Sequence, residues 1–371
     1  MSPTFDLVGQ VQLRPGPGHT TLTSTRPALV GRLTQGRRPE ELPLLLGSLF
    51  TLCGHAHQLA AQMAVDAALG RASPSPSPAA AAALRVATAR DQLVRIAHDW
   101  PRLLPGVPDE ALAQSLVHCP LGPALRDPVA QQSALAALPA WLEKHWLGLP
   151  AAEWLARQEQ TPVEWATHWA RGSTTALARL LRAHHGPAAR LATPSRPLSL
   201  AALEAGGFQE LAQQLDTLPA DALPQWQGAV PDTGPWTRRR DASPLPAHNA
   251  WMRLLSRLTD LLHLAVPGGE DWLAGGRLQP APGQGIAWVE MARGLLIHWV
   301  QLSDGPAGPR VAACRVLAPT DWNFHPHGVL AHALADVTHE DDARRLAVAF
   351  DPCVAFSVEM PQTTAQESPH A

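Results

Sequence analysis

Two short stretches from opposite ends of the chain decide its fold: LFTLCGHAHQLAA at residues 49–61 and DPCVAFSVE at residues 351–359. Each stretch carries one cysteine, with a phenylalanine three residues away from it. A Cys-x-x-Cys pair places two thiolates within reach of one metal ion, and two such pairs make a four-thiolate site. Because each pair here has lost one thiol, a complete site of this kind cannot form. We therefore interpret the two stretches as remnants of a metal site.

The first stretch resembles the first cysteine motif of nickel-iron hydrogenase large subunits, which reads Arg-x-Cys-Gly-x-Cys-x-x-x-His. Aligned without gaps, the arginine of the motif falls on Ser48 and its first cysteine on Phe50. The second cysteine falls on Cys53 and the histidine on His57. In the enzymes the first cysteine is a terminal nickel ligand and the second bridges nickel and iron. The resemblance thus implies that this stretch keeps the bridging thiol alone.

The second stretch resembles the C-terminal motif of the same enzymes, Asp-Pro-Cys-x-x-Cys-x-x-His. Its first cysteine, a terminal nickel ligand, falls on Cys353, and its second, a bridging one, falls on Phe356. Its histidine falls on Glu359. The enzymes are cut after that histidine. Because Glu359 replaces it here, we expect the tail that follows to be retained. We expect residues 360–371, which are polar and contain proline, to be flexible.

Three further segments are similar to motifs of the same enzymes. They are VEMARGLLIHW at residues 289–299, LAPTDWN at 317–323 and PDTGPWTR at 231–238. The corresponding enzyme motifs are Glu-Ala-Pro-Arg-Gly-x-x-x-His, Pro-Thr/Ser-x-Trp-Asn and Glu-x-Gly-Pro-x-x-Arg. The matches follow the enzymes' order and span most of the chain. The resemblance therefore implies the large-subunit fold, mainly α with a small antiparallel β part, in which the two cysteine segments meet.

The residues that differ from the enzymes indicate which relatives of the large subunit the chain resembles. Phe50 and Phe356 replace two nickel ligands, and the proton-relay glutamate has no counterpart at its nearest match, Val8-Gly9-Gln10. This combination resembles the HupK/HoxV family of hydrogenase accessory proteins. The resemblance implies a non-enzymatic chain without nickel that serves as a scaffold in cofactor assembly. The same losses disfavour a residual redox or metal-dependent enzyme.

A length of 371 residues allows one large or two modest domains, and the resemblance implies a single large-subunit-like domain over residues 1–371. Composition excludes several function classes. Hydrophobic content is 46% and formal net charge is −3, with no basic block to favour nucleic acid or an anionic membrane. The N-terminus lacks the features of a signal peptide. No apolar run approaches the roughly 20 residues of a spanning helix. We expect a cytoplasmic protein with no membrane span and no nucleic-acid partner.

Local patterns predict the organisation of the chain. Residues 1–36 fit short strands and turns, residues 71–79 a Pro/Ser-rich loop, and residues 280–320 a β insertion with β-like runs over 286–302 and 310–317. Helical patterns begin at Pro39 and recur over 79–98, 127–147, 151–185, 198–216, 247–265 and 328–349. Cys53 and His57 then lie near or on a helix, where a separation of four places both side chains on one face.

Cys53 and Cys353 are the predicted metal ligands. The alternative is two buried thiols that act as small apolar side chains, the usual state of free cysteine. Two thiolates suffice for an iron that already holds three strong diatomic ligands, but they are too few for a tight nickel site. Since Cys53 matches a bridging position and Cys353 a terminal one, iron would sit differently than in the enzymes or be transferred through one thiolate.

His57 and Arg293 are the predicted cofactor-contacting residues. His57 could orient a thiolate or a diatomic ligand by hydrogen bonding, or it could be a structural histidine that faces its helical neighbours. The enzyme arginine that matches Arg293 lines the pocket near the iron cyanides, and a guanidinium suits a cyanide nitrogen. Gly294 directly after it permits close backbone approach. The alternative for Arg293 is an ordinary ion pair with Glu290.

The two phenylalanines have a physical interpretation of their own. Apolar rings at Phe50 and Phe356 would fill the volume that nickel occupies in the enzymes and leave a less anionic pocket. Such a pocket would exclude a second metal while it still admits a neutral or weakly charged iron fragment.

Two functions remain open at this point. The first is a maturation factor that transiently holds the Fe(CN)2CO moiety, or the assembly complex that carries it, before transfer to the hydrogenase large subunit. Its enzyme-like shape would let it bind assembly chaperones of the HypC/HypD type. The alternative is a metal-free mimic of the large subunit that binds those chaperones or the hydrogenase small subunit. The two differ in whether Cys53 and Cys353 are needed.

Overall fold

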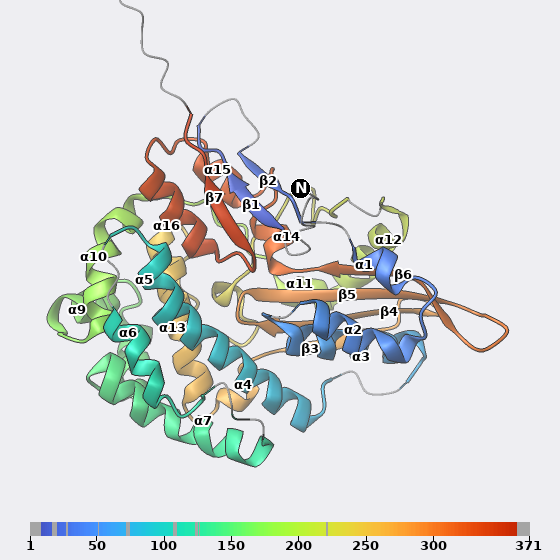
Figure 1. Ribbon diagram of the computed structural model, residues 1–371, viewed down its shortest axis with the longest axis horizontal. Helices are drawn as coiled ribbons and strands as arrows, with labels where there is room; N and C mark the ends of the chain where they lie inside the picture. Colours follow the sequence, from blue (N-terminus) through green and yellow to red (C-terminus); the bar gives the residue numbers. More distant parts are fainter. Residues whose placement is uncertain are drawn as a thin grey trace, which may run out of the picture.

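The computed structural model describes residues 9–16, 21–26, 29–50, 52–71, 75–106, 110–122, 125, 127–219 and 222–361. Figure 1 shows helices α4 to α10, α13 and α16 gathered on one side and a β-rich region on the other, with α2 and α3 lying over the long strands.

The helices are α1 (Val30–Thr34), α2 (Leu42–Leu49), α3 (Gly54–Ala68), α4 (Pro78–Val94), α5 (Trp100–Leu103), α6 (Glu110–Ser115), α7 (Pro128–Leu142), α8 (Ala151–Gln160), α9 (Glu164–Gly172), α10 (Ala176–Arg190), α11 (Leu200–Ala202), α12 (Phe208–Thr217), α13 (Ala250–Ala265), α14 (Pro319–Asn323), α15 (Val329–Leu334) and α16 (Glu340–Phe350). The strands are β1 (Gln10–Leu13), β2 (Leu22–Ser24), β3 (Gly275–Leu278), β4 (Gln284–Met291), β5 (Gly294–Ser303), β6 (Arg310–Leu317) and β7 (Ala355–Val358). The predicted fold class, mainly α with a small antiparallel β part, is confirmed.

The helical region surrounds α13, which α4, α7, α8, α10 and α16 contact. Its leucine-rich sequence is apolar on several faces, so nearly every side chain of the helix is buried. The Asn249 side chain caps its N-terminus by accepting a hydrogen bond from the Met252 backbone N–H at 2.9 Å. The predicted helical range, 247–265, agrees with this helix.

The prediction of one helical stretch over 151–185 is wrong, because α8, α9 and α10 divide it. Helix α8 ends before Pro162, and the residue that precedes a proline disfavours the helical conformation. The chain is extended again at Ser173, and Thr175 then starts α10 by accepting a hydrogen bond from the Ala178 N–H at 3.3 Å. Local capping signals therefore prevail over the apolar periodicity of the stretch.

A four-stranded antiparallel sheet with strand order β3-β4-β5-β6 separates two apolar clusters. Alternate residues of β4 point to opposite faces: Ala287, Val289 and Met291 pack with α2 and α3, whereas Ile286 and Trp288 pack with α12. Both faces are thus buried, which explains why these strands are almost continuously hydrophobic. The predicted β insertion over 280–320 lies within this sheet, although β3 begins earlier at Gly275.

The predicted β-like run over 286–302 is a hairpin, in which Met291 pairs with Gly294 and Ala292 and Arg293 form the turn. Gly294 has a φ of 130°, a conformation that side-chain-bearing residues avoid. A Cβ on Gly294 would lie 2.6 Å from Thr233 Oγ1 and 2.8 Å from the Gly234 nitrogen. The close approach predicted for this glycine is therefore made to the 231–238 segment, and the turn carries Arg293 at its tip.

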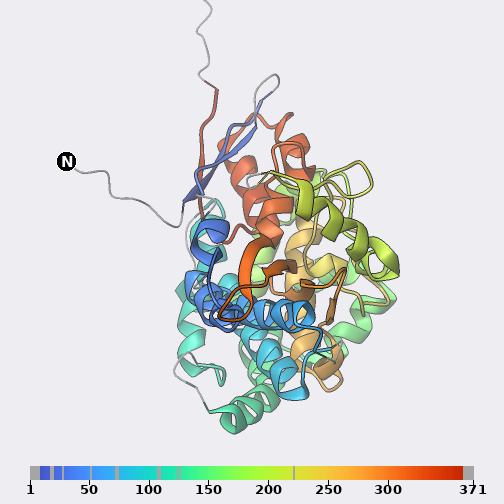
Figure 2. The same ribbon diagram turned by 90° about the vertical axis from the view of Figure 1, so that its right-hand side faces the viewer.

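A second, three-stranded sheet has the order β2-β1-β7 and joins the two ends of the chain. Strand β1 pairs with β2 in antiparallel and with β7 in parallel orientation, with Gln10 opposite Ala355. Figure 2 shows the N-terminal strands in blue beside the C-terminal strand in red. Of the predicted flexible tail, 360–371, residues 362–371 lie outside the described residues, as do 72–74 of the predicted Pro/Ser-rich loop.

No helix in the described part of the chain has the length and apolar character that crossing a bilayer requires. That residues 1–371 form a single domain stays a prediction.

Candidate functional site

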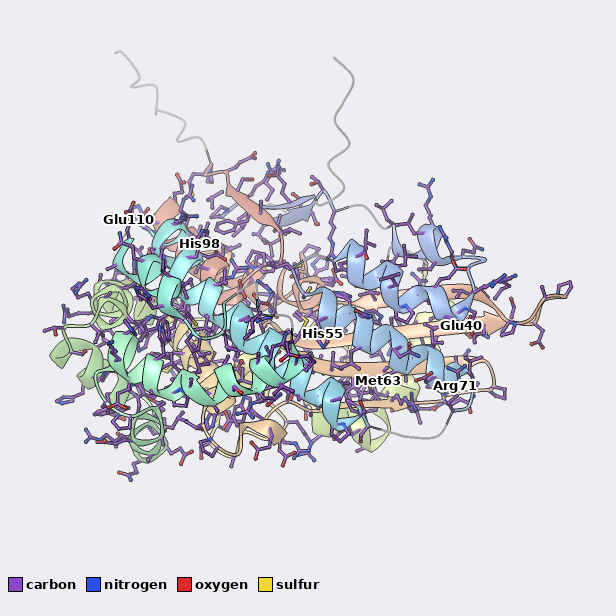
Figure 3. The ribbon with its side chains drawn as sticks, turned by 60° about the horizontal axis from the view of Figure 1, so that its bottom comes forward. Glu40, His55, Met63, Arg71, His98 and Glu110 are labelled. Atoms are coloured by element: carbon purple, nitrogen blue, oxygen red, sulfur yellow. The ribbon has the colours of Figure 1, made fainter. Side chains whose placement is uncertain are left out.

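Cys53 lies in the tight turn between α2 and α3 and directly precedes α3. The turn depends on two glycines, since a Cβ on Gly54 would lie only 2.3 Å from the Gly47 carbonyl oxygen. The His57 backbone N–H donates to the Cys53 carbonyl at 3.2 Å and so starts the helix. Figure 3 shows His55 at the inner end of α3 and Arg71 beyond its outer end. The end of α3 that Cys53 precedes thus faces the middle of the molecule.

Cys353 follows α16 in the segment that leads to β7. Its backbone N–H donates to Thr320 Oγ1 at 3.2 Å, and the Thr320 hydroxyl donates to the Cys353 sulfur at 3.1 Å. Thr320 belongs to α14, in the LAPTDWN segment that resembles an enzyme motif. One hydroxyl therefore fixes both the backbone and the sulfur of this cysteine.

The two sulfurs are close enough to influence each other electrostatically. The pKa of the Cys53 thiol is raised to about 12, mainly by burial; Arg293 and Arg26 oppose the shift, while the charges of Cys353 and Asp91 add to it. At neutral pH Cys53 is therefore a thiol, and a metal that binds it must displace its proton. The two cysteine segments meet, as predicted, around Arg26: its guanidinium lies over the Phe50 ring and pairs with Asp321, which is next to the Thr320 that binds Cys353.

Arg293 lies beside both cysteines and is fully buried, with 1% of its side chain exposed. Its Nη1 lies 2.6 Å from an Asp91 carboxylate oxygen, and its Nε lies 3.3 Å from Asp351 Oδ2. Burial opposes its charge, but Asp351 and Asp91 together raise the pKa of Arg293 above its usual value. The alternative for Arg293, an ordinary ion pair, is thus present, but its partners are Asp91 and Asp351 and not Glu290. Glu290 instead accepts backbone hydrogen bonds from Arg239 and Ala274.

Asp351 is the centre of a buried charge network that holds the C-terminal cysteine segment. Its carboxylate lies 2.6 Å from Arg95 Nε, 2.7 Å from Arg257 Nη2 and 3.3 Å from Arg293 Nε. Burial alone would raise the pKa of Asp351, but the three arginines lower it, so the carboxylate is charged. Asp351 also has a φ of 55°, which its side-chain contacts stabilise.

Sequence reasoning missed most of this network, namely Asp91, Arg95 and Arg257. One signal could have found part of it. Arg257 and Asp260 lie within the leucine-rich sequence of α13 and are buried there, and a buried charge must have a partner. Asp260 pairs with Arg238 at 2.7 and 2.8 Å. The identity of the partners has no local signal, because they come from distant segments.

His57 is buried and its partner is another histidine. Its Nδ1 lies 3.0 Å from His298 Nε2, and the Phe50 ring stacks on it with the centroids 3.8 Å apart. Burial lowers the pKa of His298 to about 3 and that of His57 well below its usual value, so both rings are neutral. His298 comes from the 289–299 segment, where sequence reasoning gave it no role. The structure therefore joins the two motifs through this histidine pair.

Phe50 and Phe356 belong to different apolar clusters. Phe50 packs with Cys53 against the cluster of α2, α3 and the sheet. Phe356, opposite Val11 in the terminal sheet, packs against the cluster of the helical region. Phe50 is the ring that stacks on His57, and that the two rings together fill one volume stays a prediction. Beside it, the Arg26 guanidinium lies 5.1 Å from the Phe50 ring centroid.

Among the described residues, no group of three or more His, Cys, Asp or Glu side chains is placed to hold a metal ion. The two cysteines are the thiols that the structure offers at this site.

Comparison with known proteins places the chain among hydrogenase accessory proteins. It is 38% identical to the hydrogenase expression/formation protein HoxV of Cupriavidus necator, over 98% of each chain. It is 32% identical to the hydrogenase expression/formation protein HupK of Rhizobium leguminosarum, over 91% of each chain. The chain belongs to the HoxV/HupK family. No protein-family model matches it.

The chain shares its fold with nickel-iron hydrogenases, as the structural comparison shows. The chain is similar to the nickel-iron-selenium hydrogenase of Desulfomicrobium baculatum, with a TM-score of 0.55 and 13% identity, over 90% of this chain and 93% of that one. An NAD+-reducing nickel-iron hydrogenase gives a TM-score of 0.50 at 16% identity. A stretch of 99 residues is also 27% identical to the uptake hydrogenase large subunit of Rhizobium leguminosarum. The resemblance to a degenerate large subunit is thus confirmed.

Proposed function

We propose that this chain is a non-enzymatic maturation factor that transiently carries the Fe(CN)2CO moiety to the large subunit of a nickel-iron hydrogenase. One observation carries the proposal: thiols from two distant segments lie in one region with two arginines. Arg293 pairs with Asp351, two residues before Cys353, and Arg26 lies over the ring of Phe50, three residues before Cys53. The names of the relatives, hydrogenase expression/formation proteins, support the accessory role.

The charges of the site fit this cargo. Iron(II) with two cyanides and one carbonyl is neutral, and two thiolates give the bound complex two negative charges. Arg26 and Arg293 are permanent cations close to both sulfurs, and guanidinium groups donate strong hydrogen bonds to anionic acceptors. The Thr320 hydroxyl, which already donates to the Cys353 sulfur, would donate more strongly to a thiolate.

Two thiolates also suit a carrier better than an enzyme. A cargo with three diatomic ligands of its own needs few bonds to the protein and can leave when a site with more thiolates competes. The large-subunit-like fold would let assembly chaperones of the HypC/HypD type, or the hydrogenase subunits themselves, bind this chain as they bind the enzyme. These partners belong to the proposal.

Infrared spectroscopy tests the proposal on protein purified without oxygen from cells that make the assembly machinery. We expect cyanide and carbonyl stretches in the wild-type protein that vanish in Cys53→Ala and in Cys353→Ala. Cys119→Ala is the matched control, because this half-buried thiol lies outside the site and should leave the bands unchanged. Bands that persist in both site variants would refute the proposal.

A metal-free mimic of the large subunit is the second candidate, and one observation favours it. Phe50 already stacks on His57, and Arg293 already has two carboxylate partners, so these side chains have partners within the chain itself. The double variant Cys53→Ala/Cys353→Ala separates the two functions. Full hydrogenase maturation with this variant would establish the mimic, and failed maturation with normal folding would support the carrier.

A further inference from the structure

Arg26 is a cation at the site that no motif signals. It follows β2 and enters the site from the terminal sheet. A Cβ on Gly9 would lie 2.5 Å from the Arg26 Cα, so the backbones of the two residues are in direct contact. Gly9 has a φ of 66°, which favours glycine. The backbone position from which the Arg26 side chain extends is therefore fixed.

The guanidinium of Arg26 lies over the ring that replaces a nickel ligand. It is 5.1 Å from the Phe50 centroid, within the range of a cation–π contact. Its charge interacts with both cysteines: Cys353 and Cys53 raise the pKa of Arg26, and Arg26 lowers the pKa of Cys53. A permanent positive charge is therefore placed beside both thiols, on the side that Phe50 covers.

Arg26 and Arg293 differ in how firmly they are held. Arg293 has two carboxylate partners and is 1% exposed, so its charge is already balanced. The described ion pair of Arg26 joins its Nη1 to Asp321 Oδ1 at 3.7 Å, too long for a hydrogen bond, and the side chain is 21% exposed. Arg26 is therefore the less constrained of the two guanidinium groups and can turn to a ligand, whereas Arg293 is held between Asp91 and Asp351.

We propose that Arg26 sets the selectivity of the thiol pair by excluding bare divalent cations and admitting a metal complex of net negative charge. A divalent ion bound to Cys53 and Cys353 would meet the guanidinium as a like charge, in a poorly hydrated site. An iron with two cyanides and two thiolates would meet it as an opposite charge with hydrogen-bond acceptors. The Phe50 ring also excludes bare divalent cations, because it occupies space beside the thiols.

The exclusion of bare cations can be measured with cobalt(II) alone, since cobalt–thiolate bonds have characteristic absorption bands. Reduced, oxygen-free protein is titrated with cobalt(II), and the bands are assigned by their loss in Cys53→Ala/Cys353→Ala. We expect Arg26→Gln to bind cobalt(II) at least tenfold more tightly than wild-type protein, and Arg26→Lys to stay near wild type. Arg14→Gln is the control, because Arg14 has an exposed ion pair with Glu359 in the same sheet. Equal affinities of wild type and Arg26→Gln would overturn the proposal.

A second variant moves the affinity in the opposite direction. Asp321→Asn keeps a side-chain oxygen for the Ala318 N–H, which donates to Asp321 at 2.8 Å, but removes the negative charge near Arg26. We expect cobalt(II) to bind more weakly than to the wild type. Tighter binding would contradict the proposal even if Arg26→Gln failed to fold.

The selection of an anionic complex rests on the proposed carrier function and has its own readout. Arg26→Gln should retain less than half of the wild-type cyanide and carbonyl infrared intensity per protein, and Arg26→Lys most of it. Undiminished bands in Arg26→Gln would refute this part. Absence of the bands from wild-type protein would refute the carrier function instead, whereas the cobalt titration would still decide whether Arg26 excludes cations.

Discussion

The two halves of the site are held in different ways. The C-terminal half, from Asp351 to Cys353, is fixed by charge: three arginines converge on Asp351, and Thr320 binds Cys353. The N-terminal half, around Cys53, is fixed by close packing: Gly47 contacts Gly54, and neutral rings stack beside the thiol. The difference indicates that a degenerate site can lose ligands and still keep the two remaining thiols in place by independent means.

Asp351→Asn would break the charged half and should have the largest effect. Asparagine keeps the size of the side chain and tolerates a positive φ, but it leaves buried arginines without their shared carboxylate. Removing one partner of a buried ion pair costs about 3–5 kcal/mol of unfolding free energy. Denaturant unfolding measures this, with the exposed Glu359→Gln as a control that should change stability by less than about 0.5 kcal/mol. A loss no greater than the control's would show that the network does not depend on Asp351.

Gly54→Ala tests the packed half. The new Cβ would lie 2.3 Å from the Gly47 carbonyl oxygen, so one of the two helices must shift. Overpacking of this kind costs about 1–3 kcal/mol, measured by denaturant unfolding. Gly186→Ala in α10 is the matched control, since nothing lies within 4 Å of its Cβ, and alanine should stabilise that helix by about 0.5–1 kcal/mol. Equal effects of the two substitutions would remove the argument for a tight turn.

Acid should weaken the packed half through His298. Burial lowers its folded-state pKa to about 3, so on acidification the unfolded chain, with a pKa of about 6.5, binds the proton first. The stability that neutral His298 provides is thus present above pH 6.5 or so and is lost as the pH falls toward 3. Between pH 7.5 and 5.5 the loss is about 1.4 kcal/mol. Unfolding free energies of the wild type and His298→Gln at both pH values measure it. The variant should lose less, and equal losses would contradict the assignment.

Thr320→Val should have the smallest effect on the unfolding free energy, and it tests how Cys353 is held in the charged half. Valine keeps the shape of the side chain but removes the acceptor for the Cys353 N–H and the donor to its sulfur. We expect a loss of about 1 kcal/mol by denaturant unfolding and faster alkylation of Cys353. Thr320→Ser, which keeps the hydroxyl, should alkylate at the wild-type rate. Unchanged alkylation in the valine variant would show that the hydroxyl does not hold the thiol.

Much of this architecture could be predicted, because the motifs that resemble the enzymes carry the fold with them. The meeting of the two cysteine segments, the β insertion and the helix around 247–265 all agree with the structure. Where patterns alone were used, boundaries were less accurate. The 286–302 run contains a hairpin turn at Arg293, which apolar periodicity does not reveal. The roles of Cys53, Cys353, His57 and Arg293 toward a cofactor stay predictions.

The sequence could not predict the individual side-chain contacts between distant segments. The alternative for Arg293 was a partner three residues away, whereas its partners are Asp91 and Asp351. Arg26 likewise reaches the site only because β2 pairs with β1 and β1 with β7. Short strands with few residues have weak register signals, so neither pairing can be inferred from local patterns.

The parallel pairing of β1 with β7 determines when the site can form during synthesis of the chain. A ribosome makes β1 long before it makes β7, the strand that completes the sheet, and long before Cys353, which lies just before β7. Contacts between such distant segments form late, because the entropy of closing the long intervening loop must be overcome first. During synthesis the chain therefore exposes at most one of the two thiols in its final setting, and a pair that could capture a metal exists only after the rest of the molecule has folded.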